Sequence, residues 1–278
     1  LDRAQVPPRS RVAIRGFGFT FIDAVLALTE GRGGGFTPDD SAGGLGYEPS
    51  GAEPSLILPW SRTGRPMLAK PAPDEFPELD DFAAEVIGEL PRWCGPDPNA
   101  ALIRMLSRCA RRMLARLGAG PALALADFTA WLEAAAEGRA PRPADPAADI
   151  ASSIAIAARR AQPDMEWALG HAWRTTYPAI VGCFGSEEIT ASQRSRFLCL
   201  AREMERLAFG PPPENASRLL ALHIAGVVDF AHLGTEGPPD AVDVVVDAVL
   251  PPPGVRGILS GPAAALVRDG VLASAPGG

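Results

Sequence analysis

The order of apolar and polar positions predicts strand, helix and strand at the start of the chain. Residues 12–14 form a short apolar run that ends before Gly16, as a buried strand does. Residues 20–30 then carry apolar side chains at helical spacing, and residues 55–58 predict a second buried strand that Pro59 ends. Such a βαβ unit is in nearly all cases right-handed and parallel. Between helix and second strand, a stretch rich in Gly, Ser and Pro predicts an irregular excursion or a small hairpin.

Helical periodicity dominates the middle of the chain, from about residue 74 to 234, with prolines between the helices. Asn99 is predicted to cap one helix, which Gly118 ends. A further helix is predicted over residues 192–209, and Asn215 is predicted to cap the next one.

A β-branched run at residues 242–250 predicts a third strand that returns to the first sheet. The predicted fold class is therefore α/β, a Rossmann-like βαβ unit with a large α-helical insertion and a returning strand. The corresponding segments are residues 1–73 for the βαβ unit, 74–238 for the mainly helical insertion, and 239–278 for the returning strand and tail.

Composition narrows the class of protein. Apolar residues make up 47% of the chain, too many for disorder, yet no apolar run is long enough to cross a bilayer. The 26 Lys and Arg against 33 Asp and Glu leave a net charge of −7, so nucleic acids and anionic membranes are not expected partners. The 4 cysteines form no CxxC pair, which predicts reduced thiols in a cytoplasmic protein and no metal site.

Candidate chemistry begins directly after the first strand, at Gly16-Phe17-Gly18-Phe19-Thr20. Gly16 and Gly18 allow a tight turn and close approach to a pyrophosphate, while the start of the helix offers N–H groups and its dipole. Phe19 lies within this turn, and Thr20 either donates a hydroxyl to a phosphate or simply caps the helix. Phe21 stands where the dinucleotide fingerprint has Gly or Ala, so the pattern is GxGxxF. The alternative is that the turn only connects strand and helix and binds no ligand.

Ser61 and Arg62 follow the second strand, where a Rossmann fold meets the adenosine ribose. An arginine there suits a 2′-phosphate, so Arg62 favours NADPH over NADH. The alternative is a solvated arginine in a turn.

Several segments together resemble the bacterial FAD-NAD(P)-binding proteins, flavoproteins similar to N-hydroxylating flavin monooxygenases. The segments are GFGFTFIDAVLALTEGRGGGF at 16–36, LGYEPSGAEP at 45–54, SRTGRP at 61–66, EMERLAFGPPPENA at 203–216 and VDVVVDAVLPPPG at 242–254. The resemblance covers most of the chain, and the stretch from about residue 100 to 163 matches only loosely.

The resemblance implies that Gly16, Gly18 and Thr20 contact the pyrophosphate of NADP, and that Ser61 and Arg62 lie beside its adenosine end. It also implies FAD, but the glycine turn that binds FAD in the family is not found in this sequence. The expectation is an interior portion of a flavoprotein, whose partners are a small-molecule substrate and the missing FAD-binding portion.

Two further groups of residues have both a functional and a structural interpretation. An arginine stripe either binds an anion or partner protein, or pairs with the acidic segment of residues 75–89; the stripe consists of Arg104, Arg108, Arg111, Arg112 and Arg116. An aromatic cluster either lines a pocket beside nicotinamide or flavin, with His171 transferring protons near neutral pH, or belongs to the core; it consists of Trp167, His171, Trp173, Arg174 and Tyr177.

Two functions are compatible with these patterns. The first is the NAD(P)H-binding portion of a flavin-dependent oxidoreductase, which transfers hydride from NADPH to FAD, with monooxygenation as a further step. The second is a noncatalytic nucleotide-binding or protein-interaction module derived from such a flavoprotein. The sequence assigns no catalytic residue in either case.

Overall fold

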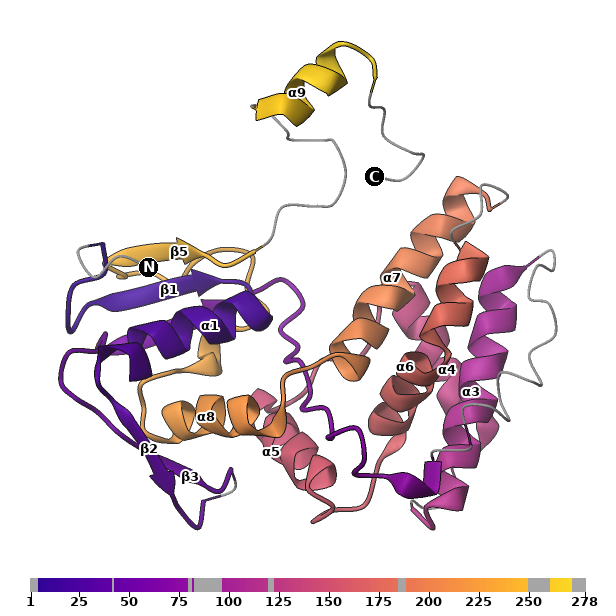
Figure 1. The fold of residues 1–278 in the computed structure, drawn as a ribbon, viewed down its shortest axis with the longest axis horizontal. Coiled ribbons are helices and arrows are strands. Elements are labelled where there is room, and N and C mark those ends of the chain that lie inside the picture. The colour runs from indigo at the N-terminus through magenta and orange to yellow at the C-terminus, as the bar shows by residue number, and fades with distance from the viewer. Residues whose placement is uncertain are drawn as a thin grey trace.

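A computed structural model describes residues 5–41, 43–79, 82, 97–119, 123–184, 189–249 and 261–271. The parallel sheet with its helices and a group of long helices form two parts of the molecule (Figure 1). Buried apolar side chains form one core around the sheet and another among the long helices.

The parallel sheet has three strands in the order β4-β1-β5, with β1 spanning Arg11–Arg15, β4 Leu56–Trp60 and β5 Val244–Asp247. Outside β4, Val228 adds a single parallel bridge to Ile57. Counted from this edge, the segments are the third, second, first and fourth in the chain, which matches the first four positions of the Rossmann order 3-2-1-4-5-6. The predicted Rossmann-like α/β fold is confirmed.

β4 continues through Pro59, where the sequence predicts its end. Both the N–H and the carbonyl of Ile57 bond towards the Val228 side, at 2.8 and 3.0 Å. Pro59, two residues further along, turns its missing N–H to this same outer side. A proline is tolerated there because no hydrogen bond to β1 is lost.

The core on the sheet side is completed by three helices and a hairpin. α1 spans Phe19–Leu28, α5 Pro146–Ala157 and α8 Pro213–Ile224, and the predicted hairpin forms from β2, Gly35–Pro38, and β3, Leu45–Glu48. α8 contacts α1, α5 and β3 (Figure 1). Residues of α5 and α8 thus pack in the same core as the βαβ unit, although they lie between residues 74 and 238 in the sequence. The three-segment domain division itself stays a prediction.

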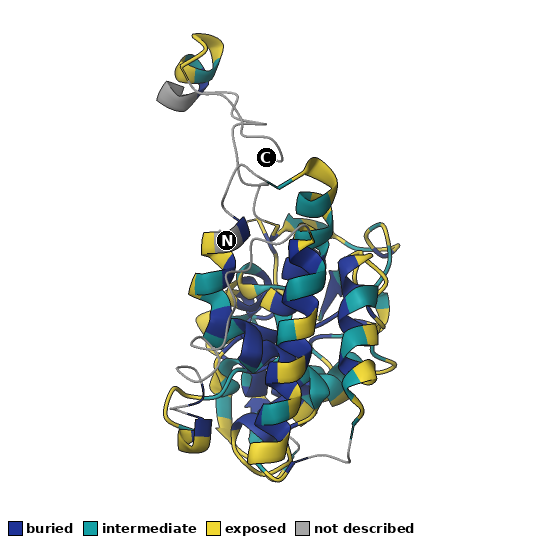
Figure 2. Ribbon diagram, turned by 90° about the vertical axis from the view of Figure 1, so that its right-hand side faces the viewer, coloured by how far each residue is buried: buried dark blue, intermediate teal, exposed yellow. Residues whose placement is uncertain are grey.

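The helical core contains four long helices, α3 at Pro98–Arg116, α4 at Leu125–Ala136, α6 at Met165–Phe184 and α7 at Ala191–Ala208. α3, α4 and α7 each turn a buried stripe inwards and an exposed face outwards (Figure 2), whereas α6 is buried or half-buried over most of its length. Trp173 is the largest of the fully buried side chains. Short elements complete the description: the 3-10 turns η1 Glu30–Arg32, η2 Pro77–Leu79 and η3 Phe230–His232, and α9 at Gly261–Arg268.

Helix starts differ from the sequence predictions at two places. Asp97, not Asn99, caps α3, and its carboxylate accepts from Ala100 N at 3.0 Å. The Asn99 amide is buried and donates to Gln193 O instead. α8 begins at Pro213 rather than after Asn215, because proline at the first helical position needs no N–H partner. Gly118 does end α3, in the left-handed conformation.

Candidate functional site

The turn between β1 and α1 lies at the carboxyl end of the sheet, beside the point where the strand order reverses between β1 and β5. Ligands of open α/β sheets bind at such a point. Gly16 has φ +103°, and its N–H donates to Trp60 O at 2.9 Å. A Cβ at Gly16 would lie 3.2 Å from Ala248 O, so the turn passes close to the segment after β5. The turn therefore requires glycine at this position.

Gly18 precedes the first residue of α1 in extended backbone and offers no side-chain cap. The first N–H groups of α1 have no partner within the helix. Thr20 is half-buried in this first turn, while Phe19 has 46% of its surface exposed. Gly16, Gly18, Phe19 and Thr20 thus share one backbone turn at the helix N-terminus, an arrangement that can hold an anion.

Phe21, the departure from the dinucleotide fingerprint, is completely buried. Its ring lies 5.0 Å from that of Phe17, which in turn meets Phe230 at 5.3 Å in an edge-on contact. These rings fill the space that a small residue would leave between helix and sheet.

An ion pair joins the ends of β1 and β5. Arg15 Nη1 lies 3.1 Å from Asp247 Oδ2, and the Arg15 guanidinium lies 5.7 Å from the centre of the Trp60 ring. The Val249 N–H and Arg15 lower the pKa of the Asp247 carboxyl. Both partners are more than half exposed, so the pair contributes little stability but fixes a charge at the rim of the turn.

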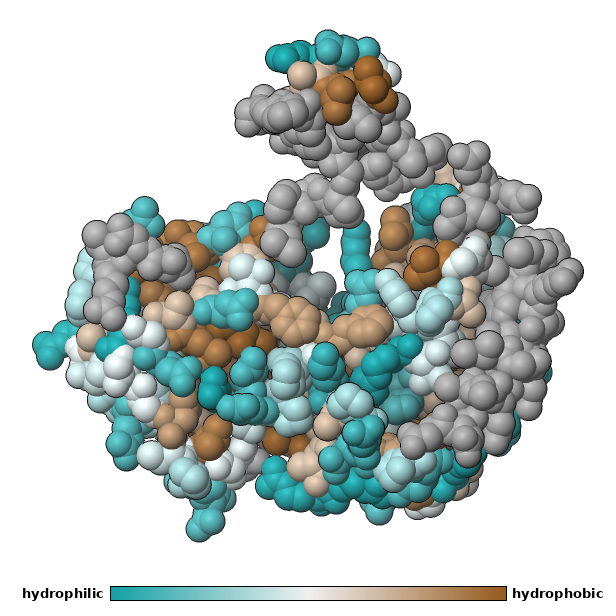
Figure 3. All heavy atoms as spheres, viewed as in Figure 1, coloured by the Kyte–Doolittle hydropathy of each residue, from teal (hydrophilic) through white to brown (hydrophobic). Residues whose placement is uncertain are grey.

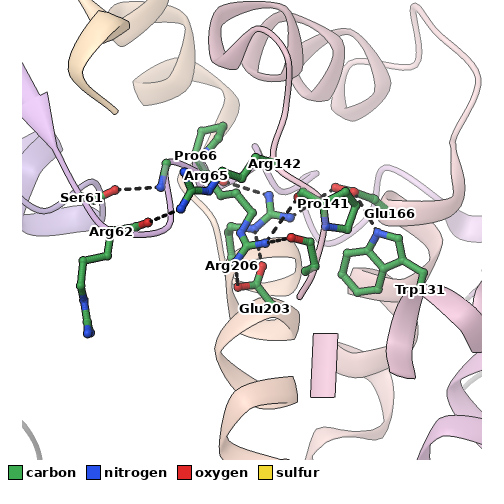
Figure 4. Close-up of polar contacts among 12 residues, drawn as sticks. Ser61, Arg62, Arg65, Pro66, Trp131, Pro141, Arg142, Glu166, Glu203 and Arg206 are labelled. Carbon is green, nitrogen blue, oxygen red and sulfur yellow. Dashed lines mark hydrogen bonds and ion pairs between the residues drawn. The ribbon is translucent and has the colours of Figure 1, made fainter. Parts of the chain in front are cut away.

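Ser61 and Arg62 directly follow β4. Trp60, the last residue of β4, pairs with Arg15, the last residue of β1, so the two residues lie next to the glycine turn. Ser61 Oγ accepts from Gly64 N at 3.3 Å, so this hydroxyl stabilises its own turn. The Arg62 carbonyl accepts from Arg142 Nη2 at 3.1 Å, while the Arg62 side chain is exposed and extends away from the neighbouring polar network (Figure 4).

Arg65, the second arginine of this segment, is buried and structural. Its Nη2 lies 2.8 Å from Glu203 Oε1, and both side chains are less than a tenth exposed. Arg206 also contacts Glu203, reaches Glu166 at 3.3 Å and donates to Pro66 O at 3.0 Å (Figure 4). This network joins the segment after β4 to α6 and α7. Sequence reasoning missed it, although Glu203 stands on the apolar stripe of its helix.

The aromatic cluster divides between the core and a pocket. Trp167 and Trp173 are buried, whereas His171 and Arg174 line a pocket of about 540 Å³. His171 Nδ1 lies 2.9 Å from Arg174 Nη2. Burial, with the nearby Arg174 charge, lowers the pKa of His171 to about 3. The predicted proton transfer by His171 near neutral pH is therefore wrong, because the imidazole stays uncharged there.

A second pocket, of about 340 Å³, lies among α5, α6, α7 and the segment after β4. Asp149, Asp164 and Glu166 line it together with Arg206. Burial raises the pKa of both Asp149 and Asp164. Arg206 is paired with Glu166, and Arg142, which also lines this pocket, donates to the carbonyls of Arg62 and Gly234, so both guanidinium groups already have partners.

The pairing of the arginine stripe with the acidic segment stays a prediction. Glu78 pairs with Arg159 at 2.6 Å rather than with the stripe, and Arg112 stacks 5.4 Å from the centre of the Phe82 ring. Most of the acidic segment lies outside the described residues.

Cys109 and Cys199 are free thiols, and burial raises the pKa of Cys109 to about 12. Cys94 and the Cys183 side chain lie outside the described residues. Within the ranges given above, no three His, Cys, Asp or Glu side chains gather as metal ligands. Of the helices in those ranges, none is long and apolar enough to span a membrane.

Comparison with known proteins gives partial matches. No protein-family profile matches the chain. The chain is 40% identical over 70 residues to nitrosuccinic acid synthase npaA of Aspergillus oryzae, and 41% identical over 70 residues to an L-aspartate N-monooxygenase (nitrosuccinate-forming) of Streptomyces cremeus. Each match covers 25% of this chain and 10% of the relative, so the chain spans about a tenth of the length of these relatives. Over that quarter the chain is thus similar to a nitrosuccinic acid synthase and to an N-monooxygenase, and a monooxygenase is an oxidoreductase.

Proposed function

We propose that this chain is the NAD(P)H-binding portion of a flavin-dependent oxidoreductase, with NADPH as the preferred nucleotide. The observation that carries the proposal is the glycine turn, which joins β1 to α1 at the switch point of a sheet in Rossmann order. The similarity to N-monooxygenases supports an oxidoreductase, and monooxygenation of a small-molecule substrate belongs to the proposal for the whole protein.

The proposed site fits a dinucleotide through its backbone. The Gly16 and Gly18 positions let the chain approach a pyrophosphate closely, and the N–H groups at the start of α1 face its negative charge. The Thr20 hydroxyl is the adjacent side-chain donor. Phe19 and Val249 each expose nearly half of their surface beside this turn, and apolar atoms are exposed over this part of the molecule (Figure 3). Such surface suits a ring of the ligand.

Arg62 is the proposed contact for the 2′-phosphate. Its side chain is exposed beyond the end of β4, and only its carbonyl is used by the fold, through Arg142. When bound, NADPH supplies a hydride, and the proposed acceptor is FAD held by another portion of the protein. This chain's own contribution is to bind and orient the nucleotide.

Calorimetry with NADPH and NADH tests the proposal. The Arg62→Ala substitution is expected to weaken NADPH binding by about 1.5–3 kcal/mol, the range of a charge-assisted hydrogen bond, and to leave NADH binding unchanged. Arg108→Ala is the matched control, because Arg108 is exposed on α3 in the helical core. Equal losses for both nucleotides would contradict the 2′-phosphate role. If neither nucleotide binds at millimolar concentration, the noncatalytic interaction module is the better interpretation.

A further inference from the structure

A pocket that shares no lining residue with the glycine turn has the walls of a ligand site. It lies between the segment after β4, the start of α8 and one face of α6, and has a volume of about 540 Å³. Four prolines, Pro71, Pro73, Pro212 and Pro213, form much of its wall together with Phe76. We name it the proline pocket. Its size and apolar character are those of small-molecule sites, which add only a few polar groups to fix orientation.

The charged groups of the proline pocket are all cationic. Arg174 and Lys70 line it, and no Asp or Glu is among its lining residues. Arg174 is partly buried and donates to Ala208 O at 3.0 Å and to His171 Nδ1. Across the described ranges, no carboxylate is paired with this guanidinium. A partly buried cation without an opposite charge is costly, and a bound anion would offset that cost.

His171 adds a neutral donor to the same pocket. A guanidinium can only donate, so the Arg174 contact makes Nδ1 an acceptor and leaves the proton on Nε2. No described residue bonds to Nε2. The ring is held in place by stacking on Trp167, with centroids 5.0 Å apart. The pocket therefore combines an apolar wall, a fixed N–H donor and two cations.

We infer that the proline pocket binds a small organic anion, a carboxylate carried on an apolar body of the size of one or two rings. Arg174 would pair with the carboxylate, His171 Nε2–H would donate to it, and the prolines and Phe76 would cover the apolar body. This site is separate from the glycine turn and does not depend on the proposed nucleotide function.

A charge series of one ring system tests this inference on the whole chain. The probes are 1-naphthoate, the neutral 1-naphthalenemethanol and the cationic 1-naphthylmethylammonium, measured by calorimetry. Naphthoate is expected to bind at least roughly tenfold more tightly than the alcohol, as a charge-assisted hydrogen bond predicts, and the ammonium ion most weakly. Equal binding of naphthoate and the alcohol would overturn the inference.

Variants locate the site. Arg174→Gln is expected to abolish the preference for naphthoate over the alcohol, and Lys70→Met to reduce it. Arg62→Ala is the control, since it alters the proposed nucleotide site and should leave naphthoate binding unchanged. An Arg174→Gln protein that folds and keeps the full preference would refute the assignment. If this variant does not fold, the charge series on the unmodified chain and Lys70→Met decide the question.

Histidine-labelled NMR gives an independent readout, because the chain has only 3 histidines. Naphthoate is expected to shift the signals of His171, assigned with His171→Phe, and to leave those of His223 and His232 in place. Shifts confined to His223 or His232 would place the ligand elsewhere and contradict the inference.

Discussion

Single side chains in this protein differ from their sequence interpretation mainly where burial changes their chemistry. His171 looked suited to proton transfer, yet burial and the nearby Arg174 charge lower its pKa and keep the ring neutral at pH 7. Arg62 and Arg65 lie three positions apart in one turn, and one is exposed while the other is buried against Glu203. Residue type and spacing alone do not distinguish these cases.

The lowered pKa of His171 predicts a dependence of stability on pH. The folded pKa is about 3 against an ordinary 6.5, so between these values the unfolded chain binds a proton that the folded chain does not. Stability from this group is therefore present above about pH 6.5 and lost as the pH falls towards 3, by at most about 1.4 kcal/mol per pH unit.

Urea unfolding at pH 7 and pH 4.5 measures this effect. The His171→Phe protein is expected to lose less stability on acidification than the unmodified chain. The raised pKa values of Asp149 and Asp164 act in the opposite direction, but they act in both proteins and cancel in the comparison. Equal losses in the two proteins would show that His171 titrates normally.

At Gly210 the backbone passes so close to another segment that a side chain is expected to clash with it. A Cβ at this position would lie 1.7 Å from Leu68 O, where the segment after β4 crosses the chain between α7 and α8. Gly210→Ala is expected to lower the free energy of unfolding by about 1–3 kcal/mol or more, because the two backbones must move apart. Gly237→Ala is the control, since nothing lies within 4 Å of its Cβ position. Thermal unfolding of both variants measures the difference.

At the scale of elements, the spacing of apolar residues and the positions of glycines predict the first strand, the glycine turn, α1 and the returning strand. The start of α3 could not be predicted, because Asp97 and Asn99 are both good capping residues and the tertiary contact with Gln193 O decides between them. The end of β4 could not be predicted either, because Pro59 interrupts the strand only if its nitrogen faces β1, and it faces the opposite side. The proline pocket could not be predicted, because its walls come from segments about 140 residues apart, at residues 70–76 and 212–213.

The Asp97 cap can be measured directly. Asp97→Ala is expected to destabilise the protein by about 1 kcal/mol, because Ala100 N loses its acceptor. Asp97→Asn should restore most of this stability, since asparagine caps about as well. Denaturant unfolding of the two variants separates a capping role from a role of the charge.

At the scale of the molecule, the buried network around Glu203 ties the two cores together. Glu203→Gln leaves Arg65 and Arg206 without their shared carboxylate. We expect this variant to lower the free energy of unfolding by about 3–5 kcal/mol, as the loss of one partner of a buried ion pair does. Glu214→Gln removes an exposed partner of Arg218 and should cost less than about 1 kcal/mol. Chemical unfolding of both variants tests this, and similar losses would mean that the network adds no more than a surface pair.

Because β1 pairs with β5, the parallel sheet cannot be completed during translation until β5 has been synthesised. Arg15 and its partner Asp247 are separated by 232 residues, with every helix of both cores encoded between them. At about 5–20 residues per second, a ribosome needs roughly 10–50 seconds to cover that distance. Throughout this time the central strand lacks one neighbour, and the switch point beside the glycine turn does not yet exist. The proposed nucleotide therefore cannot assist the early steps of folding and can stabilise this site only after Asp247 has been synthesised.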